Sequence, residues 1–317
     1  MLLIEQIDKL IEQQLREWQL VRDNYAALDE ARYREVILEN SLDKSRIVLQ
    51  YNPKRLRSSS AKIDAASLKA RPCFLCSDNQ PQQQESVVWD KLYKIQVNPY
   101  PIFSRHLTIS TVEHTPQRMG GSIAHMMRLA KDLNGYVVFY NGPRSGASAP
   151  DHAHFQAGIC QELPICSELA GATINLLDAN SNGMFGSVTS LSRPVFQIET
   201  LDIEQGEQWF NDLIDVLPVK EGHDEPMINL LCWHEGNSWH ITVFPRRKHR
   251  PACYGTGEDQ FVLSPASVDL GGLWAIAREE DYNTLTLHDV RLILMDVCIS
   301  PEDFEVISDK LYEKYHT

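Results

Sequence analysis

The chain has 317 residues, of which 43% are hydrophobic and 23% are charged, a balance typical of folded globular proteins. Disorder as the main state is excluded, and the longest apolar stretches are far shorter than the roughly 20 residues that a membrane helix needs. The net charge of −13 argues against a nucleic-acid polymer as partner, because phosphate backbones favour an extended basic surface.

The N-terminal third is predicted to begin with an amphipathic helix. No secretory signal precedes it, so we expect a cytoplasmic protein. Apolar residues recur at helical spacing from Ile4 to Tyr25, which predicts a helix packed on a larger body. A strand is predicted from Arg46 to Pro53, and a basic, serine-rich loop follows it. Lys54, Arg55 and Arg57 of this loop could bind a nucleotide phosphate, and a solvated charged face is the alternative.

The middle of the chain alternates strands and one helix. Strands are predicted at Leu92–Val97 and His106–Thr111, a helix at Ile123–Leu133 and a strand at Tyr136–Tyr140. The segment from Asn141 to Asp151 is rich in small residues, which let backbone amides approach a bound anion.

The last third resumes after a turn-rich segment, Asp178–Gly183, which is the best candidate for a boundary between halves. A hairpin is predicted from Met227–Cys232 and Trp239–Phe244, and helical patterns run from Leu285 to Tyr315. The irregular alternation of strands and helices predicts the α+β class. A second basic run after the hairpin contains three further candidate phosphate ligands: Arg246, Arg247 and Lys248.

His152, His154 and Gln156 alternate directly after the small-residue loop. On an extended strand all three side chains lie on one face. A neutral imidazole is a nucleophile toward phosphorus, and a carboxamide can donate a hydrogen bond to a phosphate oxygen. A pair of packing histidines on an edge strand is the alternative, and the preceding loop favours the catalytic interpretation.

Cys73 and Cys76 have the spacing of half a tetrahedral zinc site, which needs two further nitrogen or sulfur ligands. A total of seven cysteines, an odd number, favours reduced thiols or a metal site over a disulfide framework. A redox motif is the competitor, but such motifs open a helix after a strand, and the flanking residues here are typical of a loop. Two buried thiols without a metal are the remaining alternative.

Together these segments resemble the histidine triad (HIT-like) superfamily, in the branch of galactose-1-phosphate uridylyltransferase and the nucleotide phosphorylases, which act on diadenosine tetraphosphate or GDP-hexose. The resemblance is carried by Cys73-Phe-Leu-Cys76, by the segment 104–114 and by the segment from Asn141 to Gln156. The uridylyltransferase pattern is Asn, a Gly-rich stretch, Ser and then His-Pro-His-x-Gln. Here Ala153 replaces the proline.

The resemblance implies a HIT-like antiparallel sheet with flanking helices. We expect an N-terminal helical segment at 1–45, a catalytic half at 46–180 and a second HIT-like half at 181–317. Because Trp239-His240-Ile-Thr offers one histidine, we expect no second metal site of the kind that some uridylyltransferases carry in that half. The resemblance also implies roles by position: zinc ligands Cys73, Cys76, His114 and His152; nucleophile His154; transferred phosphate held by Gln156; nucleotide phosphates contacted by Asn141 and Ser148.

The implied activity is nucleotidyl transfer between phosphate groups through a nucleotidyl-histidine on His154, for example from a nucleotide sugar to a sugar 1-phosphate or orthophosphate. A dinucleoside polyphosphate phosphorylase and a non-catalytic, zinc-stabilised nucleotide-binding protein are the alternatives. Histidine triad hydrolases carry a histidine where Gln156 stands, and an amide cannot protonate a basic leaving group. The His154 Nδ1–H is expected to bond a backbone carbonyl on or near its own strand. We expect a structural zinc, no membrane partner, and a monomer or homodimer.

Overall fold

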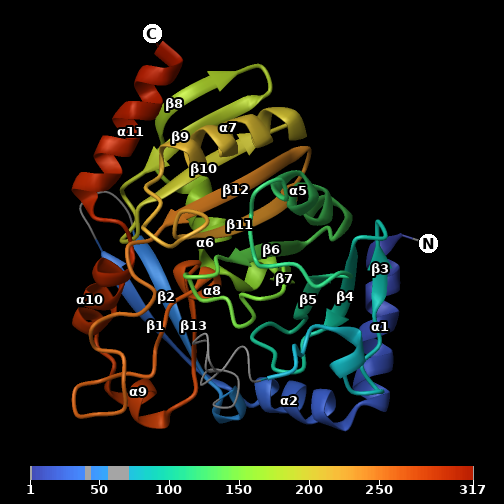
Figure 1. The fold of residues 1–317 in the computed structure, drawn as a ribbon. Coiled ribbons are helices and arrows are strands. Elements are labelled where there is room, and N and C mark those ends of the chain that lie inside the picture. The colour runs from blue at the N-terminus through green and yellow to red at the C-terminus, as the bar shows by residue number, and fades with distance from the viewer. Residues whose placement is uncertain (1, 40–43, 56–70, 317) are drawn as a thin grey trace.

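Ten strands form one antiparallel sheet in the order β3-β4-β5-β7-β6-β11-β12-β10-β9-β8 (Figure 1). This computed structural model describes residues 2–39, 44–55 and 71–316. The strands of this sheet are β3 (Val87–Trp89), β4 (Tyr93–Val97), β5 (Leu107–Thr111), β6 (Tyr136–Asn141), β7 (His154–Ile159), β8 (Asn175–Asn180), β9 (Gly183–Val188), β10 (Val195–Thr200), β11 (Ile228–Glu235) and β12 (Ser238–Pro245).

The sheet consists of two halves with the same topology. Counted from its own edge, the first half has the strand order β3-β4-β5-β7-β6 and the second half the equivalent order β8-β9-β10-β12-β11. Helix α5 (Ile123–Asp132) precedes β6 in the first half, and helix α7 (Ile203–Val216) precedes β11 in the second. The halves meet where β6 pairs with β11, and Phe139 faces Leu231 at the centre of this pairing. The expected α+β fold with a large antiparallel sheet and flanking helices is confirmed. Asn180 ends β8, and the turn after it joins β8 to β9. The first five-stranded unit therefore ends with β7, and the second begins with β8.

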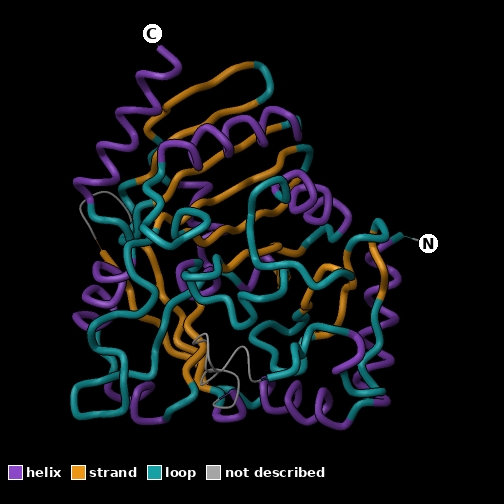
Figure 2. Tube along the Cα trace, in the orientation of Figure 1, coloured by secondary structure: helices purple, strands orange, loops and turns teal. Residues whose placement is uncertain are grey.

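One face of the sheet is covered by helices from the N-terminal, middle and C-terminal parts of the chain (Figure 2). These are α1 (Leu3–Glu17), α2 (Gln19–Asp29), α5, α7 and α11 (Pro301–His316). The predicted helix at 4–25 is two helices, because Trp18 takes an extended conformation (φ −111°, ψ 102°) and separates α1 from α2. Apolar residues of both helices face the same core, so the periodic pattern did not reveal the break. None of the helices in the described ranges is both long and apolar enough to cross a membrane.

The other face packs against a three-stranded sheet in the order β1-β2-β13. β1 (Arg32–Glu39) and β2 (Lys44–Tyr51) are antiparallel, whereas β13 (Leu273–Ile276) runs parallel to β2. A second hydrophobic core lies between the sheets and includes Phe139, Leu231 and Trp274. The elements around it are α6 (Pro164–Glu168), α8 (Ser267–Leu270), α9 (Glu279–Thr284) and α10 (Leu287–Val297). The 3-10 helices are η1 (Pro53–Arg55), η2 (Ser77–Asn79), η3 (Cys160–Glu162) and η4 (Leu169–Gly171).

Candidate active site and metal centre

The candidate nucleophile lies where β7 begins, opposite the end of β6. Alternation along β7 puts His154 and Gln156 on the face opposite Phe155, whose ring lies in the core under the helices. The His154 side chain is almost enclosed, with 5% of the residue exposed. Of the three side chains predicted to share one face, His154 and Gln156 do so. His152 precedes β7, and its Nδ1 lies beside the sulfurs of Cys73 and Cys76.

The His154 ring has a defined tautomer. Its Nδ1 lies 2.8 Å from the backbone oxygen of His152, which can only accept, so Nδ1 carries the proton and donates. This is the hydrogen bond expected from the sequence, and it leaves a lone pair on Nε2. Burial lowers the pKa of His154 to about 4, and the hydrogen bond to the His152 carbonyl offsets only part of this effect. The imidazole is therefore neutral near pH 7.

Gln156 is held by two donors that the sequence interpretation missed. Its Oε1 accepts from His106 Nε2 at 3.1 Å and from Asn98 Nδ2 at 3.3 Å. His106 is buried directly before β5, and its position in the sequence gives no indication that it contacts Gln156. With the oxygen engaged, the amide N–H₂ of Gln156 is the group left to donate to a ligand.

Asn141 is oriented in the same way from the other half of the chain. Its Oδ1 accepts from Asn229 Nδ2 at 2.8 Å and from the Ser267 backbone N–H at 2.9 Å. Asn229 is in turn held by Arg246, whose Nη1 donates to its Oδ1. The Asn141 amide N–H₂ is thus also the group available to a phosphate.

Arg246 uses its hydrogen-bond donors inside the protein. Besides Asn229, it donates to the backbone oxygens of residues 265, 297, 248 and 249. A guanidinium has five N–H groups, and these contacts account for all of them. The geometry therefore supports a role in holding Asn229, and through it Asn141, in place of the direct phosphate contact that the sequence predicted.

The remaining basic candidates lie in different surroundings. Arg247 and Lys248 both form ion pairs with Asp296 at the surface. The Arg55 guanidinium donates to the backbone oxygen of Tyr100, and Lys54 is exposed in η1, which follows β2. Arg57 lies outside the described residues. Ser148 is half-buried in the loop between β6 and β7, where its backbone oxygen accepts from Arg71. Phosphate contacts by Lys54, Arg55 and Ser148 stay predictions.

The four predicted metal ligands come together at one end of the site. The ligand atoms of Cys73, Cys76, His114 and His152 all lie within 4.8 Å of one another. Cys73 Sγ is 3.4 Å from His152 Nδ1, and Cys76 Sγ is 3.2 Å from His114 Nδ1. These distances match the edges of a tetrahedron with metal–sulfur and metal–nitrogen bonds of about 2.3 and 2.0 Å.

Neighbouring groups fit a cation at this cluster. His152 Nε2 lies 2.9 Å from the Thr111 backbone oxygen and donates to it, so Nδ1 presents its lone pair to the sulfurs. The buried Lys94 donates to the Leu75 backbone oxygen at 2.7 Å and so fixes the loop between the two cysteines. The cluster can hold a metal ion with two thiolates and two imidazoles, a donor set typical of structural zinc.

The second half has different residues at the equivalent positions. Matching the start of β6 to the start of β11, and the end of β7 to the end of β12, places Trp233, His240 and Thr242 where the first half has Asn141, His154 and Gln156. Trp233 stacks on His240 with ring centroids 4.9 Å apart and planes 9° apart.

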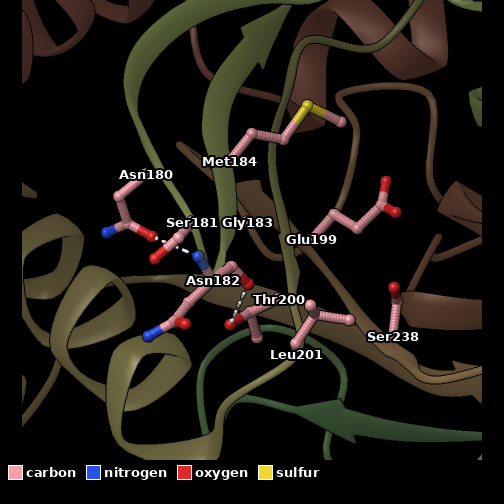
Figure 3. A pocket seen from close by; sticks show the side chains of 9 residues that line it. All are labelled: Asn180, Ser181, Asn182, Gly183, Met184, Glu199, Thr200, Leu201 and Ser238. Carbon is pink, nitrogen blue, oxygen red and sulfur yellow. Dashed lines mark hydrogen bonds between the residues drawn. The ribbon is translucent and has the colours of Figure 1, made fainter.

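A pocket lies near His240, and β9, β10 and β12 contribute residues to its lining. Figure 3 shows Glu199, Met184 and Ser238 lining it, and register places Glu199 next to His240. Both amides that flank His154 in the first half are replaced here, by an indole and a hydroxyl. Within the described residues, the arrangement of a buried histidine between two side-chain amides therefore occurs in the first half and not at the equivalent positions of the second.

Comparisons with known proteins agree with this architecture. Residues 10–159 match a protein family described as a domain of unknown function (DUF4922). No curated protein sequence gives a significant match. The chain is similar to the crystal structure of yeast Ap4A phosphorylase Apa2, with 18% identity, a TM-score of 0.58, and coverage of 89% of this chain and 97% of that chain.

Two further crystal structures contain the same yeast enzyme with ligands. The complex with AMP has 20% identity, a TM-score of 0.55, and coverage of 88% and 94% of the two chains. The complex with Ap4A has 18% identity, a TM-score of 0.58, and coverage of 89% and 97%. At this level of identity the likeness shows a shared fold. The fold expected from the sequence motifs, a large antiparallel sheet with flanking helices, is thereby confirmed as the fold that the chain shares with this yeast enzyme.

Proposed function

We propose that the chain is a nucleotidyltransferase that moves a nucleoside monophosphate between phosphate groups through a covalent intermediate on His154. The observation that carries the proposal is the neutral, enclosed imidazole, whose Nδ1–H is held by the His152 carbonyl. A nitrogen nucleophile must present a lone pair to phosphorus, and this hydrogen bond leaves the lone pair on Nε2.

In the first displacement, His154 Nε2 attacks the α-phosphorus of the donor. A P–N bond forms as the P–O bond to the leaving phosphate breaks, and that oxygen leaves with the electron pair. The amide groups of Gln156 and Asn141 donate to the oxygens of the transferred phosphate, whose charge they stabilise. A phosphate leaving group is stable as an anion near neutral pH, so no proton donor is needed.

In the second displacement, an oxygen of the acceptor phosphate attacks the same phosphorus. The P–N bond breaks and His154 returns to its neutral form. Gln156 has no ionisable proton, so a basic amine leaving group would receive no assistance from it. This chemistry favours transfer between phosphates over hydrolysis of phosphoramidates, and it gives ping-pong kinetics.

A dinucleoside polyphosphate with orthophosphate as acceptor is the first donor and acceptor pair to test, because the similar yeast structures are of an Ap4A phosphorylase bound to AMP and to Ap4A. A nucleotide sugar with a sugar 1-phosphate is the second pair on the same chemistry. Cys73, Cys76, His114 and His152 would hold a structural zinc, whose four protein ligands leave no open position for substrate. A site built by a single chain is part of this proposal, because both halves of the sheet lie in one chain.

The test is incubation with diadenosine tetraphosphate and ¹⁸O-labelled orthophosphate, followed by mass analysis of the products. Phosphorolysis predicts ATP together with ADP that carries the label, whereas hydrolysis would give unlabelled AMP. A UDP-sugar with a labelled sugar 1-phosphate serves as the second arm. His154→Ala should abolish turnover and retain nucleotide binding. Binding of nucleotides by the wild type without turnover in either arm would overturn the proposal in favour of a non-catalytic binding protein.

A further inference from the structure

The side chain of Gln117 joins β6 to β7 at the point where their pairing stops. Gln117 is buried, with 2% of the residue exposed. Its Nε2 donates to the backbone oxygens of Asn141 and His154, at 2.9 and 3.0 Å. Its Oε1 accepts from the His154 backbone N–H at 2.7 Å. One amide thus contacts the backbones of both the candidate nucleophile and the candidate phosphate ligand.

This amide takes the place of direct bonds between the strands. The β6–β7 ladder runs from the pair Tyr136–Ile159 to the pair Phe139–Gln156. Continued two residues further in the same register, it would pair Asn141 with His154. An antiparallel hydrogen-bonded pair exchanges two backbone N–H···O bonds. Here the Gln117 amide lies between the two residues and bonds to each of them.

The second half of the chain provides an internal comparison. Its equivalent pair is Trp233–His240, which belongs to the continuous ladder between β11 and β12. That ladder extends one pair beyond His234–Trp239, as far as Glu235–Ser238. The strands therefore stay paired in the half without the phosphate-binding amides and separate in the half that carries them.

The segment that carries Gln117 is itself fixed to the catalytic loop. The Gln117 backbone N–H donates to the Pro150 oxygen at 3.1 Å, and the Ala153 N–H donates to the Thr115 oxygen at 2.6 Å. The Thr111 N–H donates to the Ala153 oxygen at 2.9 Å. The side-chain amide therefore enters between β6 and β7 from a segment that cannot shift independently of them.

We propose that Gln117 is a positioning residue for nucleotidyl transfer, which holds the backbones of His154 and Asn141 at the separation needed for both side chains to reach one phosphate. This inference rests on the proposed function. A displacement of about 1 Å in a reacting group can cost about 100-fold in rate. Because His154 takes part in both displacements, loss of the Gln117 amide slows formation and breakdown of the nucleotidyl-histidine by similar factors.

Two substitutions separate the amide's hydrogen bonds from its volume. Gln117→Met keeps the length of the side chain and removes all three bonds, whereas Gln117→Glu keeps the acceptor for the His154 N–H and loses both donors. Gln197→Met is the matched control, because Gln197 is a buried glutamine in the other half of the same sheet, where its Oε1 accepts from Thr242.

The rate constants are measured in single turnovers, with enzyme in excess over donor for formation and with isolated adduct plus orthophosphate for breakdown. Both are expected to fall about 100-fold in Gln117→Met and in Gln117→Glu, and to stay within about twofold of the wild type in Gln197→Met. KM is expected to change far less than kcat. Equal rates in Gln117→Met and Gln197→Met, or loss confined to one half-reaction, would overturn the proposal.

A crystal structure of Gln117→Met tests the geometry without reference to activity. The expected result is closure of the ladder, with Asn141 and His154 paired directly at a Cα separation of about 5.5 Å. Strands that keep their wild-type separation would overturn the positioning role. A wild-type protein that forms no adduct would overturn the proposed function instead, and the crystal structure would still decide whether Gln117 holds the strands apart.

Discussion

His106 Nε2 donates to Oε1 of Gln156 at 3.1 Å. The direction of this bond is fixed from the other side of the ring, because the Ile102 backbone N–H donates to His106 Nδ1 at 3.1 Å. Nδ1 must therefore be unprotonated and Nε2 must carry the hydrogen. A buried neutral histidine thus sets which end of the Gln156 amide is left free to face a ligand.

Substitution of His106 should lower the rate of transfer through its effect on Gln156. In His106→Leu the amide of Gln156 keeps only the Asn98 donor and can turn its oxygen toward the phosphate, so kcat/KM for transfer is expected to fall about 10- to 100-fold. Gln156→Ala should lose at least as much. The double variant should be no worse than Gln156→Ala alone, since the two residues act as a unit. If the fold-losses in kcat/KM of the two single variants multiply in the double variant, His106 and Gln156 act independently, and the proposed coupling between them is contradicted.

The same histidine should make folding sensitive to acid. Burial lowers the pKa of His106 to about 3, against about 6.5 in an unfolded chain. Between these values the unfolded chain binds the proton that the folded chain excludes, so the free energy of unfolding falls as the pH drops from 6.5 toward 3. One such group contributes a slope of up to about 1.4 kcal/mol per pH unit.

Urea denaturation at pH 4.5, 5.5 and 6.5 measures this slope. We expect a shallower dependence in His106→Leu than in the wild type. Parallel curves for the wild type and His106→Leu would show that His106 does not resist protonation in the folded state.

The Cys₂His₂ cluster predicts one tightly bound zinc per chain. Metal analysis of purified protein should find it in the wild type and in Cys253→Ser, a half-buried thiol outside the cluster. Cys76→Ser should lose most of the metal and unfold at lower urea concentration, because metal binding is coupled to folding. Zinc retained in full by Cys76→Ser, or absent from the wild type, would count against the site.

Substitutions in the basic run at 246–248 should have different effects on stability, because Arg246 is buried and Arg247 and Lys248 lie at the surface. Arg246→Met leaves Asn229 Oδ1 and several buried carbonyls without donors, so we expect a loss of about 3–5 kcal/mol in the free energy of unfolding. Lys248→Met breaks only an exposed pair with Asp296 and should cost less than about 1 kcal/mol. If Lys248→Met instead raises KM for the donor severalfold at unchanged stability, Lys248 contacts phosphate after all.

Local spacing was sufficient to predict which candidate site residues lie close together. The two-residue spacing of His154 and Gln156 and the three-residue spacing of Cys73 and Cys76 are properties of the chain itself. The strands at 92–97, 106–111 and 136–140, the helix at 123–133 and the hairpin at 227–244 follow from side-chain periodicity, and the structure confirms them.

The residues that orient those groups could not be predicted in this way. Gln117 contacts His154 from 37 positions away, and Asn229 contacts Asn141 from 88 positions away. A glutamine in a loop or a histidine at a strand end carries no periodic signal, and its role depends on which strands become neighbours. The parallel pairing of β2 with β13 is another such case, because more than 200 residues separate the two strands.

The central claim is tested most directly by the mass of the intact protein after brief incubation with diadenosine tetraphosphate, a nucleoside triphosphate or a nucleotide sugar. The reaction is quenched at alkaline pH because a phosphoramidate is labile in acid. We predict an adduct of one nucleoside monophosphate on the wild type with at least one donor, its disappearance on addition of orthophosphate or a sugar 1-phosphate, and no adduct on His154→Ala. The absence of an adduct with every donor, in protein that binds those nucleotides, would contradict covalent catalysis by His154.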